Sequence, residues 1–163
     1  MGLVRSTLAV WIGLAALAPG VVRAGEVSPF ASFVQKGDCI PEPLDGRTGS
    51  AERGRAIVLD RTTGNCLICH MVPVASEPFQ GDLGPDLSGI GARLSAAQIR
   101  LRLVDQSLLD PATLMPPYYR IDHLVRVADK YQARPILDAQ QIEDVVAWLA
   151  SLKDVSPDRG TSR

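Results

Sequence analysis

The sequence predicts a small, single, all-α domain with long irregular loops. Three observations lead to this expectation. Two of the three helical segments that can be recognised start with a capping box, and the last of them also has the apolar spacing of a helix. The stretches between these segments are rich in proline and glycine, which is typical of loops. A length of 163 residues suits one domain.

The first 24 residues have the organisation of a secretory signal peptide. Arg5 supplies a positive start, residues 8–18 form an apolar run, and Val22-Arg23-Ala24 suits a cleavage site. The alternative is an uncleaved anchor, but a spanning helix needs about 20 apolar residues and this run is shorter. We expect residues 1–24 to be removed, and the mature chain to lie in the periplasm without membrane contact.

The mature chain is weakly acidic. Two of the 17 basic residues, Arg5 and Arg23, lie in the predicted signal, and 18 acidic residues remain outside it. Nucleic-acid binding would favour a basic patch, which this balance does not suggest. No nucleic-acid partner is expected.

The predicted mature chain has an irregular lead-in, one domain and a tail. Residues 25–49 hold several prolines and glycines and form the lead-in, residues 50–154 form the domain, and residues 155–163 form a flexible tail. A first helix is predicted over residues 50–59. Gly54 weakens the interior of that helix by up to about 1 kcal/mol, which would make sense if another helix crosses it closely.

A Cys-x-x-Cys-His motif follows this helix at Cys66, Cys69 and His70. This is the attachment signature of a c-type haem. Two thiols three residues apart lie on one side of a helical turn, where each can add to a vinyl group of the same porphyrin. His70 then supplies the proximal imidazole to the iron. We expect one covalently bound haem c.

The motif has two alternative uses. A zinc site would need two further ligands, and only Cys39 and His123 remain among cysteines and histidines. A thioredoxin-like redox pair should follow a strand and open a helix, whereas a polar turn over residues 61–65 precedes this pair.

A loop over residues 81–87, Gly-Asp-Leu-Gly-Pro-Asp-Leu, follows the motif. In small c-type cytochromes a similar stretch passes the proximal side of the haem, and its proline carbonyl accepts the Nδ1 proton of the ligand histidine. A metal-bound imidazole needs its second nitrogen fixed in this way. Pro85 is the candidate for that role here; the alternative is an ordinary turn.

Two further helices are predicted, each with a capping box at its start. The first runs from Ser95 to about Val104, and Asp110-Pro111 ends it. The second runs over residues 138–152, where Glu143, Asp144 and Lys153 would complement the helix dipole. One face of this last helix is apolar, at Ile142, Val145, Val146, Leu149 and Leu152.

The intervening residues 111–137 form a proline-rich loop. Three tyrosines in this loop are expected to cover the haem edge or the core: Tyr118, Tyr119 and Tyr131.

The second axial ligand is expected to be Met115, which lies before two stiffening prolines. His123 is the alternative ligand, and an open iron site is a third possibility. Met71 is too close to His70 to reach the opposite face. Ligation by histidine and methionine fills both axial sites of the iron and raises the reduction potential of the haem. This indicates electron transfer rather than catalysis at the iron. The metal ligands are therefore expected to be His70 and Met115, and no catalytic residue is assigned.

Cys39 is the odd cysteine of the three. It is either an unpaired thiol in a loop or the partner in an intermolecular disulfide, which an oxidising compartment permits.

The chain resembles SoxX, the small c-type cytochrome subunit of the SoxAX complex of sulfur-oxidising bacteria. The matching stretches are 40–44 with Gly46, 53–58, 65–70, 81–89, 115–120, 135–137 and 145–149. Cys39 is not recognised as a position of that family. The resemblance implies a class I cytochrome c fold with long loops that cover the haem.

The resemblance also implies a function. SoxAX is an L-cysteine S-thiosulfotransferase that joins thiosulfate oxidatively to a cysteine of the carrier SoxYZ. The sulfur chemistry takes place on a SoxA-like subunit with one or two haems, and SoxX passes electrons to a soluble cytochrome c. The alternatives are a free-standing periplasmic shuttle and a haem catalyst with an open iron. We expect the exposed haem edge, around Leu67, Ile68 and Met71, to lie near the partner or the electron acceptor.

Overall fold

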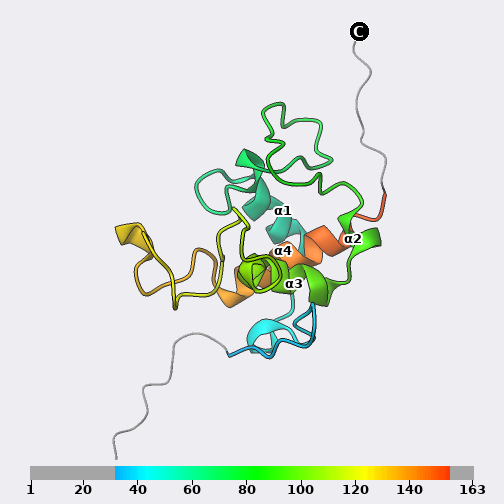
Figure 1. The fold of residues 1–163 in the computed structure, drawn as a ribbon. Helices are drawn as coiled ribbons and strands as arrows, with labels where there is room; N and C mark the ends of the chain where they lie inside the picture. Colours follow the sequence, from blue (N-terminus) through cyan, green and yellow to red (C-terminus); the bar gives the residue numbers. More distant parts are fainter. Residues whose placement is uncertain (1–31, 155–163) are drawn as a thin grey trace, which may run out of the picture.

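The computed structural model describes residues 32–154 (Figure 1). The predicted signal peptide, the start of the lead-in and the tail from residue 155 lie outside this range. Within it, the helices are α1 (Ala51–Leu59), α2 (Ile90–Arg93), α3 (Ala96–Asp105) and α4 (Ala139–Ser151). These residues form no strand beyond an isolated bridge between Lys36 and Cys39. The all-α prediction is confirmed.

Four short 3₁₀ turns lie between and around these helices in the described part of the chain. They are η1 (Leu44–Gly46), η2 (Cys66–Ile68), η3 (Gln106–Leu108) and η4 (Asp129–Tyr131). Long loops separate the helices, and the loop between α3 and α4 extends away from the helical centre (Figure 1). In residues 32–154, no helix has the length and hydropathy of a membrane-spanning segment.

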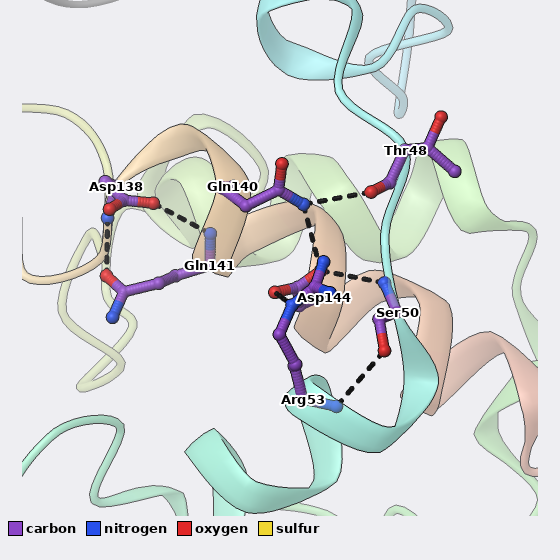
Figure 2. Close-up of polar contacts among 7 residues, drawn as sticks. All are labelled: Thr48, Ser50, Arg53, Asp138, Gln140, Gln141 and Asp144. Atoms are coloured by element: carbon purple, nitrogen blue, oxygen red, sulfur yellow. Dashed lines mark hydrogen bonds and ion pairs between the residues drawn. The ribbon is translucent and has the colours of Figure 1, made fainter.

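The three predicted helices begin close to their predicted starts. α3 and α4 each start one residue after the predicted cap, at Ser95 and Asp138, and α1 starts one residue after Ser50, whose side chain accepts from the Arg53 amide. The capping boxes of α3 and α4 are both complete; in α4, Asp138 accepts from the amide of Gln141, whose side chain accepts from the Asp138 amide (Figure 2). These local hydrogen bonds explain why the sequence located the helix starts so closely.

α1 and α4 cross at the centre of the fold, and Gly54 lies at their contact (Figure 1). A Cβ atom at Gly54 would lie 1.9 Å from the carbonyl oxygen of Asp144. The two backbones therefore approach more closely than any other residue at position 54 would allow. This is the close crossing that the glycine suggested.

A polar cluster fixes this crossing (Figure 2). The Arg53 guanidinium makes two hydrogen bonds of 2.7 Å to the Asp144 carboxylate, which also accepts from the Ser50 amide at 2.7 Å. Gln140 joins Asp144 to the carbonyl of Thr48. Burial alone would raise the pKa of Asp144, but the hydrogen bonds from Arg53, Ser50 and Gln140 hold it below its usual value.

The acidic residues near the start of α4 have a different role from the predicted one. Glu143 is buried and accepts two hydrogen bonds, of 2.7 and 2.8 Å, from the Arg100 guanidinium of α3. It also accepts from the Leu44 amide, while Arg100 donates to the Ile40 carbonyl. Glu143 and Asp144 thus tie the lead-in, α1 and α3 to α4, because a buried charge needs such partners. Lys153 lies beyond α4 and donates to the carbonyl of Gly91.

Candidate functional site

The Cys-x-x-Cys-His motif forms a single tight turn. Asn65 has a left-handed backbone, with φ of 50°, and introduces η2. The amides of Cys69 and His70 both donate to the carbonyl of Cys66, at 3.1 and 3.0 Å. This turn brings the two cysteines and the histidine into one short helical stretch, as the predicted attachment chemistry requires.

The two thiols of this turn are unpaired. Cys66 is buried and Cys69 is half-buried. Burial raises the pKa of Cys66 to about 11 and outweighs the interaction with the Tyr118 hydroxyl, which acts in the opposite direction. Burial thus favours the neutral form of the Cys66 thiol.

The two rival readings of the motif find no support in the described residues. The motif follows a turn over residues 61–64, and residues 32–154 contain no strand of the kind that precedes a thioredoxin-like pair. Within the same range, no group of three or more histidine, cysteine, aspartate or glutamate side chains is arranged to hold a metal ion.

The loop over residues 81–87 runs alongside the motif. Its amides at Gly81, Gly84 and Leu87 donate to three carbonyls of the motif segment, at distances of 2.7–2.9 Å. A Cβ atom at Gly81 would lie 2.1 Å from the Ile68 carbonyl oxygen. The glycines therefore allow a loop without regular structure to pack directly against the residues that carry the thiols.

This loop also holds the imidazole of His70. The Nδ1 atom lies 2.8 Å from the carbonyl oxygen of Pro85. Because a carbonyl only accepts, Nδ1 carries the proton and Nε2 is left with its lone pair for a metal. A Cβ atom at Gly84 would lie 2.6 Å from Nδ1, so position 84 leaves room for the ring. The contact expected between Pro85 and His70 is thus present.

The two candidates for the second axial ligand lie in different surroundings. Met115 is half-buried and packs against the hydrophobic core, and its amide donates to the Thr113 hydroxyl. His123 has a side chain that is 88% exposed and a left-handed backbone, and its Nε2 atom lies 3.4 Å from the Asp122 carboxylate. A ligand must be held toward the interior, and only Met115 meets that condition.

The donor set fits a c-type haem. Two free thiols lie on one turn, an imidazole has its second nitrogen fixed, and a thioether lies on a separate loop. Cys66, Cys69, His70 and Met115 would hold the group, which when bound supplies an iron centre that accepts and releases one electron.

An apolar patch lies on the surface beside the thiols. We define it as Ile68, Phe79 and Leu83, with exposed fractions of 62%, 80% and 66%. Phe79 and Leu83 flank Gly81, whose amide is bonded to the segment that carries Ile68. Exposed apolar groups gathered in this way are typical of interaction surfaces. Met71 nearby is also exposed, whereas Leu67 is buried in the core.

The structure also places the remaining residues singled out in the sequence, which are Cys39 and the three tyrosines. Cys39 is half-buried and its thiol donates to the Lys36 carbonyl, so an intermolecular disulfide stays a prediction. Tyr118 and Tyr119 belong to the buried core, and Tyr131 is half-buried in η4. Sequence reasoning missed the hydrogen bond from the Tyr118 hydroxyl to the Gly64 carbonyl, because these residues are 54 positions apart.

Comparison with known proteins agrees with this geometry. Residues 51–153 match the family model described as cytochrome c. Among solved structures, the chain is similar to the crystal structure of SoxXA from P. pantotrophus. The identity is 35%, the match covers 75% of this chain and 95% of that chain, and the TM-score is 0.67. Curated protein sequences gave no significant match.

Proposed function

This chain is a SoxX-like member of the cytochrome c family, and we propose that it is the monohaem electron-transfer subunit of a SoxAX-type L-cysteine S-thiosulfotransferase. The fold carries covalently attached haem c in this family. The likeness to a SoxXA structure supports a SoxA-like cytochrome as the partner. The predicted signal peptide supports maturation in the periplasm.

The observation that carries the proposal is the arrangement around His70. Its Nδ1 is bonded to Pro85 at 2.8 Å, which orients Nε2. Met115 is directed toward the core on a loop of its own. His70 and Met115 would hold the iron from both sides, which would leave no site for substrate there, and the group would supply electron exchange only.

The stoichiometry of the proposed reaction explains why a partner is needed. A carrier cysteine thiol and thiosulfate form one S–S bond, and this releases one proton and two electrons. A single ferric haem accepts one electron at a time. The sulfur chemistry is therefore assigned to the partner and the carrier SoxYZ, while this chain relays electrons to a soluble cytochrome c.

The apolar patch supports a route for those electrons. Ile68 lies between the two attachment cysteines, so a docked protein at this patch would lie beside the thioether edge of the group. A small patch of apolar side chains favours short-lived docking, as electron exchange requires.

Reconstitution tests the proposal. Thiosulfate, SoxYZ, a SoxA-like subunit and ferric soluble cytochrome c are mixed with and without this chain, and cytochrome c reduction is followed. We expect the rate of cytochrome c reduction to fall at least about tenfold when this chain is left out. Without its haem, the electrons released at the SoxA-like subunit have no direct route to the soluble cytochrome c.

Two outcomes of this assay would contradict the proposal. One is that this chain alone couples thiosulfate to the carrier thiol. The other is that the complete mixture runs equally fast without it. If the native protein also purifies without a SoxA-like chain, the free-standing shuttle becomes the better description.

A further inference from the structure

The segment that follows Met115 is fixed at several points, although it lies in a region without regular structure. The amide of Tyr118 donates to the Leu103 carbonyl of α3 at 3.0 Å, and the Tyr118 carbonyl accepts from the Leu137 amide at 3.0 Å. The Tyr118 side chain is buried. Position 118 is therefore anchored to α3 on one side and to the entry of α4 on the other.

The side chain of Tyr118 makes a third connection. Its hydroxyl donates to the carbonyl oxygen of Gly64 at 2.9 Å, in a buried position, and also lies beside the Cys66 thiol. Gly64 itself packs closely against α1, because a Cβ atom there would lie 2.6 Å from the Ile57 carbonyl oxygen. The hydroxyl thus joins the Met115 segment to Gly64, which precedes the attachment motif, and lies beside Cys66, the first residue of that motif.

Arg120 provides a second anchor two residues further on. Its guanidinium pairs with the Asp105 carboxylate, which is fully buried at the end of α3. The same carboxylate accepts from the amide and the hydroxyl of Ser107. A buried carboxylate with these partners holds its arginine firmly, since separating the pair would leave the charge uncompensated.

Pro116 and Pro117 connect Met115 to these anchors. Each proline ring fixes one backbone dihedral, and the residue before a proline is restricted to extended conformations. Because this two-residue connection is stiff, the position of Tyr118 restricts the position of Met115. A flexible connection would let Met115 move independently of Tyr118.

We propose that Tyr118 and Arg120 are positioning residues that hold Met115 in place as the axial ligand, with the Tyr118 hydroxyl fixing the Met115 segment against the attachment segment. This inference rests on the ligation by Met115 given in the proposed function. It assigns a role to two side chains that are not themselves ligands of the iron, although the Tyr118 hydroxyl lies beside the Cys66 thiol.

Displacement of Met115 by imidazole measures how firmly it is held. Imidazole binds the ferric haem only where Met115 has left, so its apparent affinity rises as that hold weakens. In the mature holoprotein, Tyr118→Phe keeps the ring and removes one hydrogen bond. We expect the apparent dissociation constant for imidazole to fall by about 2- to 10-fold, the range of one intramolecular hydrogen bond. Tyr131→Phe, which removes a hydroxyl from η4, should change it less than about 2-fold.

A second background separates positioning from other effects. In Met115→Ala protein no thioether competes, so adding Tyr118→Phe should leave imidazole affinity unchanged. If Tyr118→Phe does not yield holoprotein, Arg120→Lys tests the same idea, since lysine lacks the planar fork of arginine. It should also increase imidazole affinity.

Three results bear on the inference. If Tyr118→Phe or Arg120→Lys lowers the unfolding free energy but leaves the imidazole affinity unchanged, the residue has a merely structural role. That result would overturn the inference. An equal effect of Tyr118→Phe with and without Met115 would overturn it as well. If Met115→Ala itself leaves the ligand spectrum unchanged, the ligation proposal fails instead, so the two failures are distinguishable.

Discussion

Replacing Met115 by alanine is expected to abolish the weak near-infrared sulfur-to-iron band of the ferric protein and to lower its reduction potential. The band requires a thioether on the iron, and Met115 is the half-buried candidate on a proline-stiffened loop. A thioether favours the ferrous state, so its loss should lower the potential by on the order of 0.1 V, within the range of roughly 0.8 V that axial ligands span. Near-infrared absorption and a redox titration measure the two effects.

The matched control is His123→Ala. His123 is exposed to solvent and pairs only with Asp122, so its removal should leave both the band and the potential unchanged. The reverse pattern, in which His123→Ala removes the band and Met115→Ala does not, would show that the assignment of the axial ligand is wrong.

Replacing Gly54 by alanine is expected to destabilise the fold severely. On an exposed helix this change would stabilise by up to about 1 kcal/mol. Here the added Cβ would lie 1.9 Å from the Asp144 carbonyl oxygen, and this is backbone of α4 that cannot rotate away. We expect a loss of about 3 kcal/mol or more of unfolding free energy, at the upper end of overpacking effects. Denaturant unfolding of the holoprotein measures it.

Ala56→Gly serves as the control for this prediction. Ala56 is exposed on the same helix, so the change should cost only about 1 kcal/mol through helix propensity. If Gly54→Ala were neutral or stabilising, the close crossing of α1 and α4 described here would be wrong.

The features that depend on local signals could be predicted from the sequence. Ser95 and Asp138 are recognisable as helix starts because a side chain there bonds an amide three residues on. The start near Ser50 is predicted without its cap, which the structure shows. The contact between His70 and Pro85 was expected from a short motif with a known physical need.

The features that depend on residues far apart in the chain could not be predicted from the sequence. α2 has only four residues, and Gly89 before it offers no side-chain cap, so it carries no local signal. Glu143 follows the pattern of a residue that complements a helix dipole, and its burial against Arg100 depends on a residue 43 positions away. The bond between Tyr118 and Gly64 is likewise visible only once the loops are placed.

The central claim is that Cys66 and Cys69 attach one haem covalently, and intact mass spectrometry after acid–acetone extraction tests it most directly. Protein matured in a cytochrome c-competent host should show the polypeptide mass plus one haem, because thioether bonds survive the extraction. Protein with Cys66→Ser and Cys69→Ser together should show the bare polypeptide mass. The bare mass for the unmodified protein under the same conditions would contradict the account.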